Sequence, residues 1–267
     1  MTILEAAAPA APPVPAAGLA PAARLLPSLA AVYRAQLARA RVARIPLLFV
    51  ATFQSLGILV MMRGVVEPGD NPAAHAVVAG SAVLVVAFVA LNLLAQYFGR
   101  LRATGGLDHY ATLPVPPAAV VLGAAGAYAS FTLPGSLVTA AAGAWLFDLP
   151  IAHLWVLLAV VPLAGAALAG LGAVCGLLAP RQEIATLLGQ LGMSAALLLG
   201  VLPAGNLPQP VTWLRDLLPS TYGVEAFART FTASPDWAAV LGDLGVCAAV
   251  GLCSLTAATW AYRRATR

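Results

Sequence analysis

After residue 44, six long stretches of the chain contain no Asp, Glu, Lys or Arg, and this feature limits the possible folds more than any other. A charged side chain at the centre of a membrane helix costs about 2.5 to 3.5 kcal/mol, and about 20 apolar residues span the hydrocarbon core of a bilayer. The stretches are 18 to 39 residues long, so each can cross a membrane. They cover residues 45–62, 71–99, 109–147, 149–180, 184–214 and 244–262.

The composition agrees with a bilayer environment. Hydrophobic residues make up 61% of the chain and charged residues only 9%, whereas a soluble domain has about 25% charged residues. The stretches are apolar on all sides and show no alternation, which favours helices over barrel strands. We therefore expect an all-α membrane protein with six transmembrane helices, at residues 45–62, 73–98, 118–147, 153–179, 184–202 and 240–261.

The arginine distribution predicts the orientation of these helices. All 14 basic residues are arginines, and cytoplasmic loops of membrane proteins carry an excess of basic residues. With the N-terminus inside, only Arg63, Arg215 and Arg229 lie outside. We expect a multi-pass protein of the bacterial plasma membrane with both termini in the cytoplasm.

The chain ahead of the first span divides into two parts. Residues 1–27 are rich in Ala and Pro and are expected to be a disordered tail, because proline removes backbone donors. Residues 28–44 predict a basic helix at the cytoplasmic membrane surface, capped by Ser28, and residues 45–267 form the six-span domain. The arginines of the basic helix could bind either membrane lipid or a protein partner. They are Arg34, Arg39, Arg41 and Arg44.

Several function classes are excluded by missing residue types. Without lysine the chain has no Walker A motif, so it cannot bind and split ATP through a P-loop of its own. It has no HExxH or GxSxG motif, and Cys175, Cys247 and Cys253 form no CxxC pair. Its arginines lie in short groups between apolar spans. We expect no catalytic site, bound cofactor, metal or nucleic acid.

Small residues at helical spacing predict close helix packing within the membrane. Gly172 and Gly176 form a GxxxG pair, and Gly242 and Gly245 form another small-residue pair. Such residues let two helix backbones approach each other closely. Ordinary packing within one chain is the simpler interpretation, and a subunit interface is the alternative.

Two connecting segments are longer than simple turns. The cytoplasmic segment 99–117 could form a short helix that ends at Pro114, or it could be a solvated loop. The external segment 203–239 predicts two short helices at the outer interface, with Glu225 and Arg229 four residues apart and able to pair. Asp243 is expected to mark the outer end of the sixth span, and an intramembrane carboxylate in a proton path is the alternative.

These two segments resemble motifs of the type-2 ATP-binding-cassette (ABC-2) permeases, the membrane subunits of exporters. Segment 102–115, RATGGLDHYATLPV, is similar to the family pattern R-x-x-G-T-L-E followed by L-x-x-T-P-[VL]. Segment 218–227, LPSTYGVEAF, is similar to L-P-x-x-Y-x-x-[DE]. Here Gly106 stands where threonine is common, Asp108 replaces glutamate, and the usual acidic residue before the glycine is absent.

The resemblance implies the permease subunit of an exporter. The chain would pair with a second permease copy or a paralogue, and with two copies of a nucleotide-binding subunit that hold ATP and magnesium. The segment that would couple to the ATPase contains Arg102, Gly106, Asp108, His109 and Tyr110. An external gate helix would carry Tyr222, Glu225 and Arg229.

The pathway is expected at the dimer interface, lined by polar side chains that would otherwise face lipid. The candidates are Thr52, Gln54, Ser55, Asn92, Gln96 and Gln190, although hydrogen bonding between helices explains each of them equally well. The low aromatic content favours a hydrophobic or amphiphilic cargo over a glycan. An ion-coupled secondary transporter is an alternative that needs mid-span carboxylates, and a non-transporting scaffold subunit is a second alternative.

Overall fold

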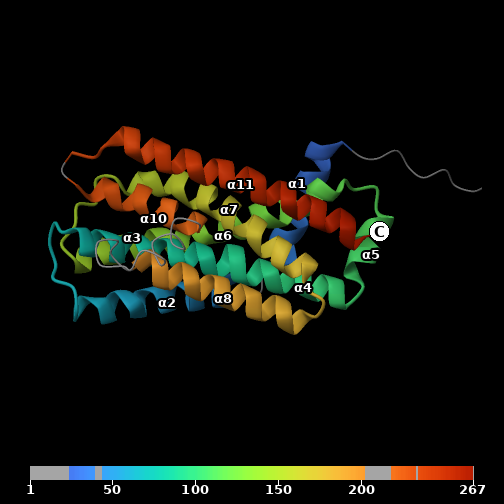
Figure 1. Ribbon diagram of the computed structural model, residues 1–267, viewed down its shortest axis with the longest axis horizontal. Coiled ribbons are helices and arrows are strands. Elements are labelled where there is room, and N and C mark those ends of the chain that lie inside the picture. Colours follow the sequence, from blue (N-terminus) through green and yellow to red (C-terminus); the bar gives the residue numbers. More distant parts are fainter. Residues whose placement is uncertain (1–23, 40–43, 202–217, 233, 267) are drawn as a thin grey trace, which may run out of the picture.

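The computed structural model describes residues 24–39, 44–201, 218–232 and 234–266, and within these ranges every regular element is a helix. Figure 1 shows long helices lying roughly parallel in one elongated bundle. The prediction of an all-α fold is confirmed. The long helices are α2 (Arg44–Arg63), α3 (Pro72–Val86), α4 (Leu94–Ala103), α6 (Pro117–Leu146), α7 (Leu157–Leu178), α8 (Gln182–Val201) and α11 (Trp237–Ala265).

Five helical segments of the described chain are long and apolar enough to cross a membrane. One of them joins α3 to α4 through the π-helical segment η1 (Ala87–Leu93), and another joins the short η2 (Leu154–Val156) to α7. Their limits agree with the predicted spans to within about five residues. The segments are Pro72–Ala103, Pro117–Leu146, Leu154–Leu178, Gln182–Leu199 and Trp237–Ala265, and Leu48–Arg63 of α2 is a shorter apolar helix.

The continuous helix α3–η1–α4 forms the centre of the bundle and packs against α6, α7 and α8. Glycines bring α7 close to it, since a Cβ on Gly172 would overlap the carbonyl oxygen of Leu91, and one on Gly176 would overlap that of Ala95. The predicted close packing at this GxxxG pair is confirmed within one chain. Gly242 and Gly245 make no such contact within the described chain, because a Cβ on either would meet no atom within 4 Å, so packing within one chain does not account for this pair.

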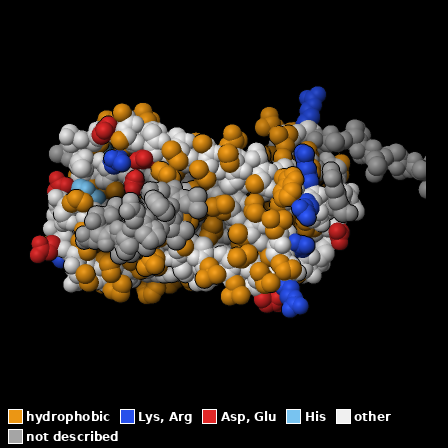
Figure 2. All heavy atoms as spheres, viewed as in Figure 1, with side chains coloured by type: hydrophobic (Ala, Val, Ile, Leu, Met, Phe, Trp, Pro, Cys, Tyr) orange, Lys and Arg blue, Asp and Glu red, His pale blue; other side chains and the backbone are white. Residues whose placement is uncertain are grey.

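The two ends of the bundle carry opposite charge, as Figure 2 shows. What we call the basic end holds α1 (Leu25–Arg39), α5 (Gly106–Thr112), the α7–α8 turn and the end of α11 (Figure 1). Its described arginine side chains are Arg24, Arg34, Arg100, Arg102, Arg181, Arg263 and Arg264. The opposite, acidic end has Arg63 and Arg229 beside Glu67, Asp70, Asp148, Glu225, Asp236 and Asp243.

Helix α1 differs from its prediction in where it begins. It begins at Leu25, so Ser28 lies in its first turn, and the Ser28 hydroxyl donates to the backbone oxygen of Arg24 at 3.0 Å. The predicted cap at Ser28 is therefore wrong, because Pro27 fits the first turn of a helix and lets it begin earlier. The side chain of Val32 is buried against Gly123 of α6.

Candidate functional site at the basic end

A tight turn after α4 creates the short helix α5 at the basic end. Gly105 has a φ of 71°, a left-handed conformation that side chains rarely adopt, and α5 then runs from Gly106 to Thr112. The hydroxyl of Thr104 donates to the backbone oxygen of Arg100 at 2.9 Å and closes the end of α4. Of the two possibilities for segment 99–117, the structure has the short helix, which ends two residues before Pro114.

Arg102 ties this turn to the end of α7. Its Nη1 donates to the backbone oxygens of Leu177 at 2.5 Å and Ala179 at 3.2 Å. These carbonyls lie at the C-terminus of α7, where no further helical N–H is available and where positive charge is favourable. Arg102 was expected to face a partner, and the structure shows it joining α4 to α7.

The sides of α5 differ in exposure. Leu107 is 3% exposed and Tyr110 is half-buried, and both pack against the core of the bundle. Asp108 and His109 are exposed, so of the expected coupling residues on α5 these two are the most accessible to a partner. Leu107, which anchors α5, was not among the residues predicted from the sequence, although it is the large apolar residue between Gly106 and Asp108.

Helix α1 lies against α6 next to this region. The hydroxyl of Tyr33 lies 2.9 Å from Oγ of Ser130, and Gln36, which is 4% exposed, donates to the hydroxyl of Tyr97 on α4. Arg34 is exposed and Arg39 ends the helix. Arg41 lies outside the described residues, and Arg44 is the first residue of α2. The buried Gln36 was not singled out by the sequence.

The six candidate pathway residues do not form one cluster. Asn92 is buried in η1, and its Oδ1 accepts a hydrogen bond of 3.0 Å from Nε2 of Gln96. Gln96 also lines a hollow of about 280 Å³ with Leu93, Tyr97, Arg100 and Tyr128. Of the other candidates, Ser55 is buried, Thr52 and Gln54 are half-buried on α2, and Gln190 is exposed on α8.

The π-helical segment around Asn92 was not predicted. Such segments are rare and often occur at functional sites. A Cβ on Gly189 of α8 would lie 2.9 Å from Oδ1 of Asn92, so α8 approaches η1 at this amide. Hydrophobic periodicity could not reveal the segment because this helix is apolar on nearly every face.

At the acidic end, the motif around Tyr222 forms α10 (Pro219–Ala228), followed by η4 (Arg229–Phe231). The predicted pairing of Glu225 and Arg229 is confirmed at 3.8 Å, and Nε of Arg229 also lies 2.9 Å from Oδ2 of Asp243. Asp243 lies in the second turn of α11, so it is near one end of its helix, as expected.

Most of α10 is buried among other helices, which differs from a helix on the membrane surface. It packs against α3, α7 and α11, and Val224 and Phe227 are each at most 2% exposed. Tyr222 is half-buried. The earlier part of the external segment, residues 203–217, lies outside the described residues, so the second predicted short helix does too.

Two comparisons with known proteins bear on this arrangement. The chain matches a protein-family model described as "ABC-2 family transporter protein" over residues 36–260. No curated protein matches the chain. The family match includes the described candidate spanning helices, apart from the last five residues of α11, and both segments on which the sequence motifs lie.

Proposed function

Because this chain belongs to the ABC-2 transporter family, a family of membrane permeases, we propose that it is the permease subunit of an exporter that moves a hydrophobic or amphiphilic compound out of the cell. ATP would be bound with magnesium and hydrolysed on a separate nucleotide-binding subunit, present in two copies. The observation that carries the proposal is α5, a short helix with exposed polar groups that is anchored to the spanning helices.

The length of α2 supports six membrane crossings. Its 20 residues extend over about 30 Å at 1.5 Å per residue, which equals the thickness of the hydrocarbon core, and an arginine stands at each end.

The tryptophans of α11 also fit a membrane crossing. Trp237 and Trp260 are about 35 Å apart along this helix at a rise of 1.5 Å per residue. Aromatic residues are enriched at both membrane interfaces.

The charge asymmetry supports a cytoplasmic position for the basic end. Cytoplasmic loops carry more Arg and Lys than external loops, and most described arginine side chains lie at this end. Helix α1 and the end of α11 are both there, so both termini would be in the cytoplasm of a bacterial cell. The gate residues on α10 would then lie near the outer surface.

The connections of α5 support transmission of a partner's movement. Arg102, at the end of α4 just before α5, is hydrogen-bonded to the end of α7, and Leu107 of α5 packs into the core. A force on α5 would therefore reach both α4 and α7. Closure of the nucleotide-binding subunits would favour one of two packing arrangements of the bundle. Such coupling requires only that the partner interacts differently with the two states.

A second permease copy or paralogue is supported by α8. It exposes Leu187, Leu191 and Leu198 together with Gln190 on its surface. Hydrocarbon would leave an exposed amide without partners, so Gln190 favours a neighbouring subunit or a hydrated pathway over lipid. The candidate pathway would extend from Gln190 towards Asn92 and Gln96 along the α8 side of the bundle.

The test removes the exposed groups of α5. In the double variant Asp108→Ala/His109→Ala, we expect normal insertion but at least a tenfold fall in ATP-dependent uptake by inverted vesicles that also contain the nucleotide-binding subunit. The control is Glu67→Ala, which removes an exposed carboxylate at the acidic end. Unchanged uptake in the double variant would contradict the role of α5.

The same preparation separates the alternatives. An ATPase that co-purifies with the chain and hydrolyses faster in the complex supports export. Uptake that follows a proton or sodium gradient without an ATPase would support a secondary transporter. The described spans contain only Glu183 and Asp243 as carboxylates, both near helix ends, so the residues favour the ATP-driven mechanism.

A further inference from the structure

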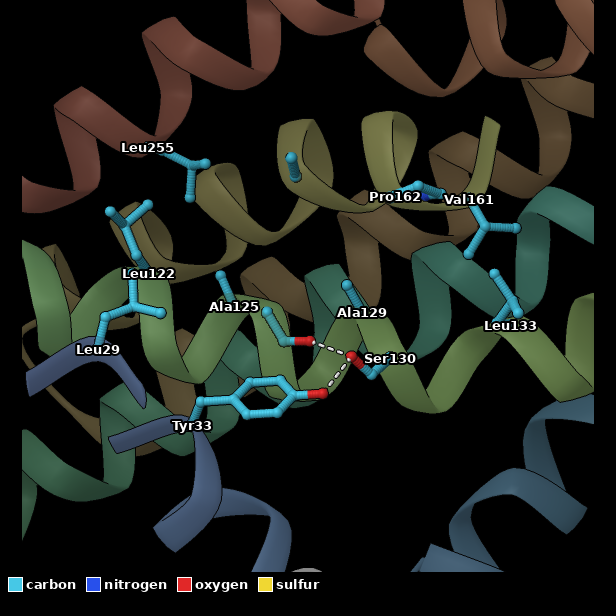
Figure 3. Close-up of a pocket in the computed structure, with 12 residues that line it drawn as sticks. Leu29, Tyr33, Leu122, Ala125, Ala129, Ser130, Leu133, Val161, Pro162 and Leu255 are labelled. Carbon is cyan, nitrogen blue, oxygen red and sulfur yellow. Dashed lines mark hydrogen bonds between the residues drawn. The ribbon is translucent and has the colours of Figure 1, made fainter. Parts of the chain in front are cut away.

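An apolar groove of about 570 Å³ lies between α6, α7 and α11, close to the point where α1 packs on α6 (Figure 3). Small residues leave this space open, and larger apolar side chains flank it. The volume is within the range of about 300 to 1,000 Å³ that is typical of ligand sites. The small lining residues are Ala125, Gly126, Ala129 and Ala166, and the larger ones include Leu122, Leu133, Val161 and Leu255.

The groove is elongated along the helices. Its lining on α6 extends from Leu122 to Leu133, which is about 16 Å at a rise of 1.5 Å per residue. Leu29 and Tyr33 of α1 also line it, and Figure 3 shows Leu29 and Leu122 close together at one end, with Leu133 towards the other. Its length and direction suit an extended chain lying parallel to the spanning helices.

The polar groups in the groove are already paired. Among the described lining residues only Tyr33 and Ser130 have polar side chains. The Ser130 hydroxyl donates to the backbone oxygen of Gly126 at 2.8 Å, so the contact of 2.9 Å to Tyr33 is donated by the Tyr33 hydroxyl. Both hydroxyl hydrogens are used within the protein, so the groove suits a hydrocarbon chain better than a polar group.

Arginines are positioned beyond one end of the groove. Arg34 is exposed and directly follows the lining residue Tyr33 on α1. On α11, the exposed Arg263 lies eight residues after the lining residue Leu255, about 12 Å closer to the basic end. Eight residues are about 2.2 turns, so the Arg263 side chain projects about 80° round α11 from Leu255 and lies two turns nearer the basic end. An anionic group at the membrane surface would therefore meet positive charge where the groove approaches the basic end.

We propose that this groove binds an acyl chain of an anionic phospholipid from the leaflet at the basic end, with the lipid phosphate near Arg34 and Arg263. The occupant would contact α1 and α11 together and would hold α1 against α6. The site is separate from the proposed pathway near Asn92, and it does not depend on ATP or on a partner subunit.

The experiment uses the full chain in nanodiscs of phosphatidylcholine with a small fraction of phosphatidylglycerol that carries a diazirine on one acyl chain. After illumination, we expect labelled peptides from α6, α7 and α11, at a level several times higher than with the matching phosphatidylcholine probe. Ala129→Leu and Ala166→Leu each fill the groove and should reduce labelling at least fivefold. The control Ala141→Leu places the same side chain at an exposed site on α6 and should leave labelling unchanged.

A second arm tests the headgroup. Arg34→Gln/Arg263→Gln should reduce labelling by the phosphatidylglycerol probe to the level of the phosphatidylcholine probe, whereas Arg181→Gln, on the α7–α8 turn, should not. Equal labelling by the two probes in the native chain would overturn the anionic assignment. Unchanged labelling in a folded Ala129→Leu or Ala166→Leu protein would overturn the site itself. A variant that loses ATP-dependent uptake but keeps normal lipid labelling would concern the proposed function and would leave the lipid site supported.

Discussion

The link between Arg102 and the end of α7 gives a prediction whose size follows from the structure. The variant Arg102→Ala removes two hydrogen bonds from a charged donor, at 2.5 Å to Leu177 and 3.2 Å to Ala179. Hydrogen bonds to charged groups contribute about 1.5 to 3 kcal/mol each. Because Arg102 is exposed, water replaces part of the loss, so we expect a combined effect of about 2 kcal/mol.

This loss can be measured as a change in melting temperature. In a protein of this size 1 kcal/mol corresponds to about 2 to 4 °C, so Arg102→Ala should melt about 4 to 8 °C below the native chain. All variants are purified in the same detergent and heated at the same rate, because membrane proteins often unfold irreversibly. Arg102→Lys keeps the charge but has no guanidinium fork, and it should recover about half of the loss.

The matched control for this prediction is Arg100→Ala, which removes an exposed arginine two residues earlier on the same helix. It should change the melting temperature by less than about 2 °C, in line with a surface substitution. Equal melting temperatures for Arg102→Ala and the native chain would refute the role of Arg102 as a link between α4 and α7. An equal loss in Arg100→Ala would show that the effect comes from the overall charge of the basic end.

Two further substitutions test the packing around this site. Leu107→Ala truncates the buried anchor of α5 and should lower the free energy of unfolding by about 2 to 5 kcal/mol. The loss should be seen as a lower melting temperature and faster proteolysis after α4. A variant as stable as the native chain would mean that α5 is held by other contacts. Gly176→Ala adds a Cβ that would overlap the carbonyl oxygen of Ala95, so it should reduce the yield of folded protein. In Gly245→Ala the added Cβ meets no atom within 4 Å, so this variant should stabilise α11 by about 0.5 to 1 kcal/mol. The same effect for both variants would contradict the close contact of α7 with α4.

The sequence predicts the spanning helices well because the cost of charge in a bilayer is a local property of each residue. Helix ends follow from the charges and prolines that flank the apolar runs, and α5 is bounded by Gly105 and Pro114. The exposed Asp108 and His109 were also identified, because the motif that contains them lies between two predicted spans. These features need no knowledge of which helices are neighbours.

The features that the sequence could not predict depend on contacts between distant parts of the chain. The partner of Arg102 is 75 residues away, and Gln36 bonds to a tyrosine 61 residues away. The spans are apolar on nearly all faces, so periodicity could not show which glycines meet another helix. For the same reason Gly176 and Gly245 look alike in sequence but differ in the structure.

The central claim is that the basic end faces the cytoplasm and binds an ATPase through α5. A single cysteine at the exposed position Ala111→Cys, in a chain whose native cysteines Cys175, Cys247 and Cys253 are replaced by Ala, reports on this directly. Glu67→Cys at the acidic end is the matched probe of the opposite side. Both are treated with a membrane-impermeant maleimide in right-side-out and inside-out vesicles.

We expect the Ala111→Cys variant to be labelled only in inside-out vesicles and the Glu67→Cys variant only in right-side-out vesicles. Addition of the nucleotide-binding subunit should lower labelling of Ala111→Cys at least fivefold and leave labelling of Glu67→Cys unchanged. Labelling of both variants from the same side, or no protection of Ala111→Cys by the bound subunit, would contradict the account.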